Sequence, residues 1–299
     1  MINTKSDINP FSLARRIKRP LILDGAMGSM LQNKGLKSRG SMWMSLANIE
    51  DSEKVLDIHK AYISAGSDII TTNTFRTNPE AVINYGKRID NIKLVKIAVE
   101  LARQAASGLP VYIAGSNAPG EDCYQIRRNL TLNKLKANHY KHIDLLIDSG
   151  CHFILNETQS HFDEIKIICQ YCHKNSIPYV ISLFVNESLN LLSGESLSSA
   201  IEFIRDYNPL AIGVNCIKPD TFMRIYSKSN FEFNWGVYLN AGKGSFDDKI
   251  IKTGTSPFIY SILVKKLLSK SPSFVGGCCG TTPEHIKSIK RLLDGKSRN

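Results

Sequence analysis

The sequence predicts a (β/α)8 barrel, because eight short apolar runs alternate with eight amphipathic stretches along its 299 residues. Most apolar runs are continuous rather than alternating, which is typical of strands buried on both faces of a parallel sheet. A doubly wound open sheet is the alternative, but it would leave distant strand ends less able to converge. The expected strands span residues 21–24, 68–73, 111–116, 153–157, 179–184, 211–216, 236–240 and 273–279.

The amphipathic stretches predict the helices that follow these strands. Ser52 is the candidate cap of the first helix and Gly66 its stop, while Pro283 and Glu284 open the last one as helix starts prefer. We expect three regions: an N-terminal extension, 1–19, with a short helix over one barrel end; the barrel, 20–294; and a frayed tail, 295–299. The expected helices span residues 52–64, 91–106, 132–147, 162–173, 197–205, 219–226, 256–268 and 283–293.

The composition indicates a globular protein with reduced thiols. The chain is 42% hydrophobic and 22% charged, which argues against extensive disorder. It has no apolar run long enough to cross a bilayer and no export signal, so we expect a cytoplasmic protein without a membrane partner. Seven cysteines at irregular spacing argue against a disulfide framework. The net charge of +11 is spread along the chain, which argues against nucleic acid as the main partner.

Polar side chains follow the predicted strands at the point where the strands end. In barrels of this type function sits at the carboxyl ends of the strands, whereas the opposite face serves stability. We therefore expect the candidate chemistry on one rim. The side chains are those of Asp24, Asn73, Ser116, Glu157, Asn215, Cys216, Asn240, Cys278 and Cys279.

Three of these cysteines predict an open zinc site. Cys278 and Cys279 are adjacent, and Cys216 ends an earlier strand. Neighbouring side chains of a strand point to opposite faces, but the glycines around the pair permit a bulged or positive-φ backbone that turns both sulfurs the same way. Zinc takes tetrahedral sulfur ligands, and three thiolates leave one position open. The pair alone would favour two buried small hydrophobes or a strained vicinal disulfide over zinc, because zinc motifs more often space their cysteines by two to four residues.

Five segments together resemble the zinc-dependent homocysteine S-methyltransferase family, over about residues 20–294 and in the same order. This family includes the S-methylmethionine and betaine enzymes and the homocysteine module of cobalamin-dependent methionine synthase. The segments are Leu-Asp24-Gly-Ala-Met-Gly, Gly66-Ser-Asp-Ile-Ile-Thr-Thr-Asn73-Thr-Phe, Asn156-Glu157-Thr, Gly213-Val-Asn-Cys216 and Gly276-Gly-Cys278-Cys279-Gly-Thr-Thr-Pro-Glu-His.

The resemblance implies that Cys216, Cys278 and Cys279 hold Zn²⁺ and that the sulfur of homocysteine takes the fourth position. It points to Asp24 and Glu157 as ligands of the substrate ammonium, although a carboxylate at a strand end is more often a helix cap or an ion-pair partner. The turn formed by Gly25, Ala26 and Met27 is expected to offer backbone N–H groups to the substrate carboxylate. Asn73 and Asn215 are expected to orient ligands or neighbours, or to satisfy backbone groups.

The expected reaction is methyl transfer to homocysteine, giving methionine, with S-methylmethionine or S-adenosylmethionine as the small donor. Trp43 lies where relatives with sulfonium donors carry an aromatic residue, and it is expected on the donor side or as a core or lid residue. Residues 115–120 depart from the Gly-Pro pair usual in the family, which leaves the donor open. The alternatives are a thiol methyltransferase served by a corrinoid- or folate-charged partner, and a non-catalytic barrel that binds zinc and thiols.

Overall fold

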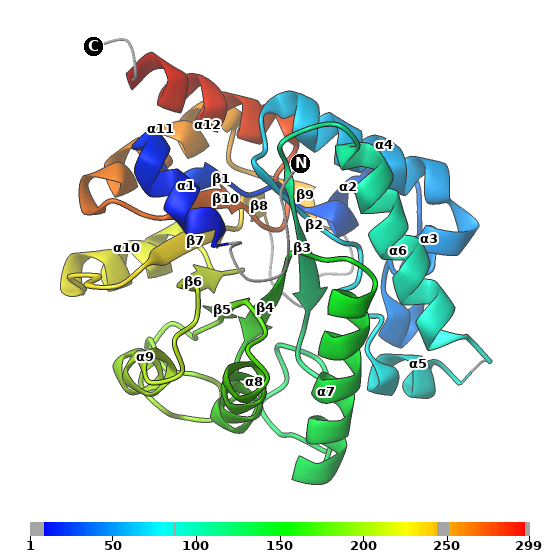
Figure 1. Ribbon diagram of the computed structural model, residues 1–299. Coiled ribbons are helices and arrows are strands. Elements are labelled where there is room, and N and C mark those ends of the chain that lie inside the picture. Colours follow the sequence, from blue (N-terminus) through cyan, green and yellow to red (C-terminus); the bar gives the residue numbers. More distant parts are fainter. Residues whose placement is uncertain (1–8, 87, 244–250, 297–299) are drawn as a thin grey trace.

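The computed structural model describes residues 9–86, 88–243 and 251–296 (Figure 1). Eight parallel strands form one sheet in the order β1-β10-β7-β6-β5-β4-β3-β2. The two ends of this sheet meet through a bridge between Leu23 and Ile69, where the Asp24 N–H donates to the Ile69 carbonyl at 3.0 Å. This contact closes the sheet into a (β/α)8 barrel, which confirms the predicted fold class.

The eight barrel strands lie in the runs expected from the sequence but are shorter at several ends. Predicted strands 21–24 and 68–73 shrink to two and three residues of regular ladder, because their polar ends have already turned toward the rim. The strands are β1 (Leu21–Ile22), β2 (Ile69–Thr71), β3 (Tyr112–Asn117), β4 (Phe153–Gln159), β5 (Tyr179–Leu183), β6 (Ala211–Asn215), β7 (Trp235–Leu239) and β10 (Phe274–Gly277).

The eight predicted helices are present and surround the barrel (Figure 1). Gly66 ends the first of them with φ of 107°, as predicted, but the cap position is Asp51 and not Ser52, which is the first helical residue. The last helix continues to Lys296, so Gly295 and Lys296 are helical rather than part of a frayed tail. The helices are α4 (Ser52–Ala65), α6 (Asn91–Ala106), α7 (Leu132–Asp148), α8 (Phe162–Lys174), α9 (Leu197–Arg205), α10 (Pro219–Lys228), α11 (Pro257–Leu267) and α12 (Pro283–Lys296).

Short elements that the sequence patterns did not predict lie in the connections. Each spans too few residues for a helical or alternating period to be visible. They are α2 (Met27–Asn33), η1 (Gly40–Met42), α3 (Ala47–Glu50), α5 (Pro79–Tyr85), the hairpin of β8 (Gly242–Lys243) with β9 (Lys252–Thr253), and η2 (Leu268–Lys270). No helix within the described residues is long and apolar enough to span a membrane.

The N-terminal extension forms helix α1 (Pro10–Ile17), which covers one end of the barrel. Asn9 caps this helix through a hydrogen bond from the Phe11 N–H, at 3.0 Å. Phe11 is 1% exposed, and its ring lies 6.5 Å from Phe153 and 5.6 Å from Phe274. Because Phe153 and Phe274 begin β4 and β10, Phe11 fills the barrel from the amino ends of the strands. This end opposes the rim that carries the candidate chemistry.

Substitution of Phe11 by alanine is expected to lower the free energy of unfolding by about 3 to 5 kcal/mol, because it leaves a cavity among aromatic rings. Ile17→Ala, on the same helix but 38% exposed, is the matched control and is expected to cost less than about 1 kcal/mol. Urea titration followed by circular dichroism measures both. Equal losses in the two variants would show that Phe11 does not hold α1 on the barrel.

Candidate active site

A cavity of about 880 Å³ opens at the carboxyl ends of the barrel strands. It is lined by nearly all of the polar side chains that were predicted to gather on one rim, namely Asp24, Asn73, Ser116, Glu157, Cys216, Asn240, Cys278 and Cys279. Asn215 is fully buried beside the cavity instead. The closure of the barrel therefore brings together residues that are more than 200 positions apart in the sequence.

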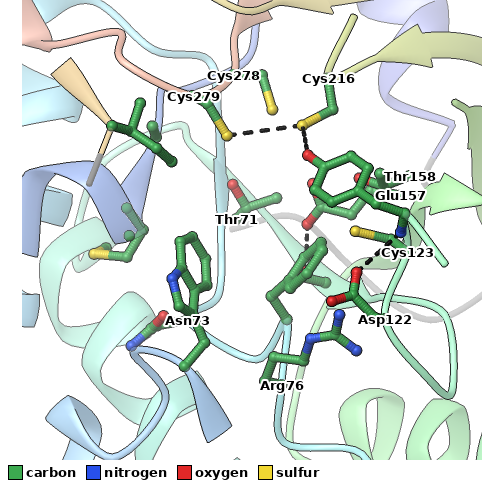
Figure 2. Close-up of a pocket in the computed structure, with 18 of the residues that line it drawn as sticks. Thr71, Asn73, Arg76, Asp122, Cys123, Glu157, Thr158, Cys216, Cys278 and Cys279 are labelled. Carbon is green, nitrogen blue, oxygen red and sulfur yellow. Dashed lines mark hydrogen bonds between the residues drawn. The ribbon is translucent and has the colours of Figure 1, made fainter. Parts of the chain in front are cut away.

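Three sulfur atoms meet at one end of this cavity (Figure 2). The Sγ atoms of Cys216, Cys278 and Cys279 all lie within 4.8 Å of one another, and those of Cys216 and Cys279 are 3.7 Å apart. All three cysteines are free thiols. Cys216 is 6% exposed, whereas Cys278 and Cys279 are half-buried and reach the cavity.

The adjacent cysteines point the same way because the strand ends before them. β10 stops at Gly277, so the predicted strand 273–279 is two residues too long, and the alternation of a strand does not apply to the pair. The chain turns instead, with the Thr281 N–H donating to the Cys278 carbonyl at 3.1 Å and Gly280 at φ of 79°. Gly280 therefore supplies the positive φ that was expected from the glycines around the pair.

The three sulfurs fit a zinc ion. Tetrahedral coordination with zinc–sulfur distances of about 2.3 Å places two sulfurs roughly 3.8 Å apart, close to the 3.7 Å between Cys216 and Cys279. Hydrogen bonding between the thiols and burial raise the pKa of Cys216 well above its ordinary value. A soft divalent cation favours the deprotonated form of such thiols. The donor set and its spacing thus match an open three-cysteine zinc site.

Two carboxyl groups face the same cavity, one from the buried Asp24 and one from the half-buried Glu157. Asp24 is 2% exposed and accepts hydrogen bonds from the Thr71 N–H at 2.8 Å and the Thr71 hydroxyl at 2.5 Å. The Ser116 hydroxyl donates to Glu157. Burial raises the pKa of Asp24 to about 8 and that of Glu157 to about 7. Among the described residues, neither group forms an ion pair with a cationic side chain that would stabilise the carboxylate.

The turn from Gly25 to Met27 lines the cavity and is tied to the cysteine pair. The Ala26 N–H donates to the Thr281 hydroxyl oxygen at 3.1 Å, and that hydroxyl donates to the Cys278 carbonyl at 2.7 Å. Helix α2 begins at Met27. One of the three backbone N–H groups expected to meet a ligand is thus already engaged with Thr281.

The two predicted asparagines hold the protein backbone. The Asn73 side chain donates to the Met44 carbonyl at 3.2 Å and to the Asn48 side chain at 3.0 Å, although Asn73 also lines the cavity. Asn215 accepts from the Thr158 N–H at 2.9 Å and donates to the Thr158 hydroxyl at 2.9 Å. Thr158 has a φ of 57° and follows Glu157 directly. Asn215 therefore fixes a strained turn beside a cavity carboxyl group.

Trp43 lines the cavity and packs against glycine and an aromatic ring. Its ring lies 5.9 Å from that of Phe75, edge to face. A Cβ atom on Gly28 would lie 2.0 Å from the Trp43 ring, so the absence of a side chain at Gly28 lets the ring lie on α2. Trp43 itself has a φ of 43°.

The comparison with known proteins agrees with this geometry. The sequence profile of the homocysteine S-methyltransferase family matches residues 21–293. The chain belongs to this family.

Solved structures show the same fold. The homocysteine methyltransferase MmuM from Escherichia coli in its metallated form superposes with a TM-score of 0.77 at 22% identity, covering 93% of this chain and 98% of that one. The oxidized form of the same enzyme superposes with a TM-score of 0.76 at 23% identity, covering 94% of this chain and 99% of that one. A methyltransferase from Methanosarcina mazei superposes with a TM-score of 0.55 at 10% identity, covering 97% of this chain and 98% of that one.

Several residues of this family member's site were not predicted from the sequence. Tyr124 places its hydroxyl 2.8 Å from the Cys216 sulfur, and Arg76, Asp122 and Tyr238 also line the cavity. Arg76, Asp122 and Tyr124 lie in connections without a helical or strand period, and only the position of these connections after β2 and β3 indicates a role. Cys123 lines the cavity too.

Cys151, Cys169, Cys172 and His285 lie outside the three-sulfur cluster. Cys169 and Cys172 are fully buried in α8, and Cys151 is buried beside β4. His285 belongs to α12, and its ring nitrogens contact the Thr282 N–H at 3.1 Å and the Thr255 carbonyl at 2.9 Å.

Gly28→Ala is expected to destabilise the protein by about 1 to 3 kcal/mol, because the new methyl group meets the Trp43 ring. Glycine to alanine within a helix ordinarily stabilises by about 1 kcal/mol, so the sign is diagnostic. When Trp43 is also replaced by alanine, Gly28→Ala should again stabilise the protein by about 1 kcal/mol. A double-mutant cycle of denaturation midpoints measures the coupling, and additive effects would refute the contact.

Proposed function

We propose that this protein transfers a methyl group from a small sulfonium donor to the sulfur of homocysteine and thereby forms methionine. The observation that carries the proposal is the convergence of three cysteine sulfurs within 4.8 Å at the end of a cavity that also holds two carboxyl groups without an ion pair to any described residue. Membership of the homocysteine S-methyltransferase family supports the same reaction.

The three cysteines would hold Zn²⁺. When bound, the ion would keep the acceptor thiol deprotonated at neutral pH, where a free thiol with a pKa near 8.5 is only about 3% ionised. That gain is about 30-fold, or roughly 2 kcal/mol, which is small beside the barrier that an enzyme must lower. Alignment of acceptor sulfur, methyl group and leaving group by the cavity must supply much of the rest.

Asp24 and Glu157 would bind the ammonium group of homocysteine. Each accepts hydrogen bonds from neutral donors and has a raised pKa, so a ligand cation would supply the charge partner that the described residues do not provide. The turn of Gly25 to Met27 would face the substrate carboxylate, with Thr281 fixing this turn relative to Cys278. Asn73 and Asn215 would act by holding the loops that present these groups.

A small free donor, S-methylmethionine or S-adenosylmethionine, fits the remaining space. A cavity of about 880 Å³ lies in the range of sites that enclose whole small ligands. Trp43 would lie on the donor side, where an aromatic ring attracts a sulfonium by about 0.5 to 2 kcal/mol.

The test is mass-spectrometric detection of methionine after incubation of zinc-loaded protein with homocysteine and each methyl-labelled donor. Labelled methionine from a free sulfonium supports the proposal. Turnover only with a corrinoid- or folate-charged protein would instead indicate a thiol methyltransferase that depends on such a partner. Binding of zinc and thiol without any product would indicate a non-catalytic barrel.

Removal of any one cluster thiol is expected to abolish stoichiometric zinc. Cys216→Ser, Cys278→Ser and Cys279→Ser should each lower zinc content from one ion per chain to under about 0.1 after dialysis, because a neutral hydroxyl is a poor replacement for thiolate. Cys123→Ser is the matched control, since Cys123 lines the cavity outside the cluster. Metal analysis by mass spectrometry measures this. Full zinc in Cys278→Ser would exclude the site.

Binding of the substrate ammonium group to Asp24 and Glu157 is expected to strengthen as the pH rises. Groups with pKa values of about 7 and 8 are mostly protonated at pH 6 and bind a cation poorly, and they ionise toward pH 8. The Kd for methionine, which has no thiol to titrate, should therefore fall at least about tenfold from pH 6 to pH 8. Glu157→Gln should flatten this dependence. Titration calorimetry measures the Kd, and a flat profile in the unmodified protein would contradict the assigned roles.

A further inference from the structure

The end of the cavity opposite the three sulfurs carries a second set of charges (Figure 2). Arg76 follows β2, and Asp122 lies in the connection between β3 and α7. Both line the same cavity as Cys216, Cys278 and Cys279. Neither residue takes part in the activation of the acceptor thiol or in the ammonium site of Asp24 and Glu157.

Arg76 is held in place by the backbone of the connection that carries Asp122. Its Nη1 atom donates to the Glu121 carbonyl at 2.5 Å and to the Pro119 carbonyl at 3.4 Å. Its guanidinium also lies 5.2 Å from the centre of the Phe75 ring. These contacts fix the Arg76 guanidinium, which is planar and carries five N–H donors. Both hydrogen bonds start from one nitrogen, Nη1. Two parallel N–H donors of a guanidinium match the two oxygens of a carboxylate.

Asp122 is oriented by its own loop and presents a carboxylate to the cavity. Its Oδ1 accepts from the Tyr124 N–H at 2.9 Å. Arg76 and Asp122 are both among the described residues, and Figure 2 draws no interaction between their side chains. Both nevertheless act on the same thiol, since burial raises the pKa of Cys123 to about 12 while Arg76 lowers it and Asp122 raises it. Two opposite charges thus lie near one another without being paired.

A ligand with both charges on neighbouring atoms can pair with both residues. An α-amino acid has a carboxylate and an ammonium group on one carbon, and the inner end of the cavity already offers Asp24 and Glu157 for the amino group of homocysteine. The aromatic contact between Phe75 and Trp43 adjoins Arg76, so a cation carried on the side chain of that amino acid would meet an aromatic surface.

We propose that Arg76 and Asp122 bind the α-carboxylate and the α-ammonium group of a sulfonium amino acid that donates the methyl group. The inference rests on the proposed function and assigns the residues that would bind its donor. In the reaction the acceptor thiolate attacks the methyl carbon and forms a carbon–sulfur bond. The bond from methyl to the donor sulfonium breaks, and its electron pair stays on the donor sulfur, which leaves as a neutral thioether.

The experiment compares Arg76→Lys and Asp122→Asn with the unmodified zinc-loaded protein. Lysine keeps the charge but loses the fork, and asparagine keeps the acceptor for the Tyr124 N–H but loses the charge. Arg127→Lys, an exposed position in the same connection, is the matched control. Three methyl-labelled donors are used: S-methylmethionine, 3-dimethylsulfoniopropionate, which lacks the ammonium group, and trimethylsulfonium, which lacks both groups.

Arg76→Lys is expected to lower kcat/KM for S-methylmethionine about 10- to 100-fold through the KM of the donor, which corresponds to loss of charge-assisted hydrogen bonds. The KM for homocysteine and the slow transfer from trimethylsulfonium should stay within about twofold. Asp122→Asn should lower kcat/KM for S-methylmethionine but not for 3-dimethylsulfoniopropionate. Arg127→Lys should match the unmodified protein with every donor.

Two outcomes separate failure of this inference from failure of the proposed function. If the unmodified protein forms labelled methionine but Arg76→Lys loses the same factor with trimethylsulfonium, Arg76 only supports the loop and the inference falls. The ammonium assignment falls if Asp122→Asn affects both carboxylate-bearing donors equally. If the unmodified protein forms no labelled methionine from any donor while binding zinc and homocysteine, the proposed function itself falls.

Discussion

The site depends on the end of strand β7, which holds the two cysteine segments together. In the sheet β7 lies between β6, which ends before Cys216, and β10, which ends before Cys278. Strands two places apart are roughly 10 Å apart, too far for their sulfurs to share an ion without convergence of the chain ends. The Cys216 N–H donates to the Tyr238 carbonyl at 3.3 Å and the Cys278 N–H to the Leu239 carbonyl at 2.9 Å. These bonds draw both segments over the end of β7.

The same convergence explains why non-glycine residues adopt positive φ around the cavity. Cys216 has a φ of 59°, and Asn240 donates to its carbonyl at 2.9 Å. Thr158 has a φ of 57° and is held through both its N–H and its hydroxyl by Asn215. Such conformations cost of order 1 kcal/mol each and persist where surrounding bonds determine them. Asn215, expected either to orient a ligand or neighbour or to satisfy backbone groups, thus stabilises the backbone next to Glu157.

Sequence reasoning found the elements whose signal is a period or a strand end. The polar residues after the apolar runs, from Asp24 to Cys279, could be placed on one rim because parallel strands in a barrel share one direction. The orientation of Cys278 and Cys279 was expected from their glycines, yet the end of β10 at Gly277 contributes as much. Arg76, Asp122 and Tyr124 could not be predicted, because side-chain direction in an irregular connection depends on tertiary contacts such as Arg76 to the Glu121 carbonyl.

Three carboxyl groups in this barrel, two buried and one half-buried, differ in the charge of their protein partners. Glu164 is 1% exposed, and burial alone would raise its pKa, but the hydrogen bond from His139 and the charge of Arg128 outweigh burial and lower the pKa to about 2. It also accepts from the Gly120 N–H at 2.7 Å, so it anchors the connection that carries Asp122 and Tyr124. Glu164 is a carboxylate whose partners are all protein groups.

Asp24 is buried and Glu157 is half-buried, and among the described residues their side chains receive only neutral donors, from Thr71 and Ser116. Their pKa values are raised because of burial. A protein that needed these side chains only for stability would gain from replacing them with neutral ones, since a buried acid without a cation destabilises the folded state once the pH exceeds its unfolded pKa. The missing charge is therefore best supplied from outside the chain. Under the proposed function, an ammonium-bearing substrate would supply that charge, and its binding would ionise the two acids.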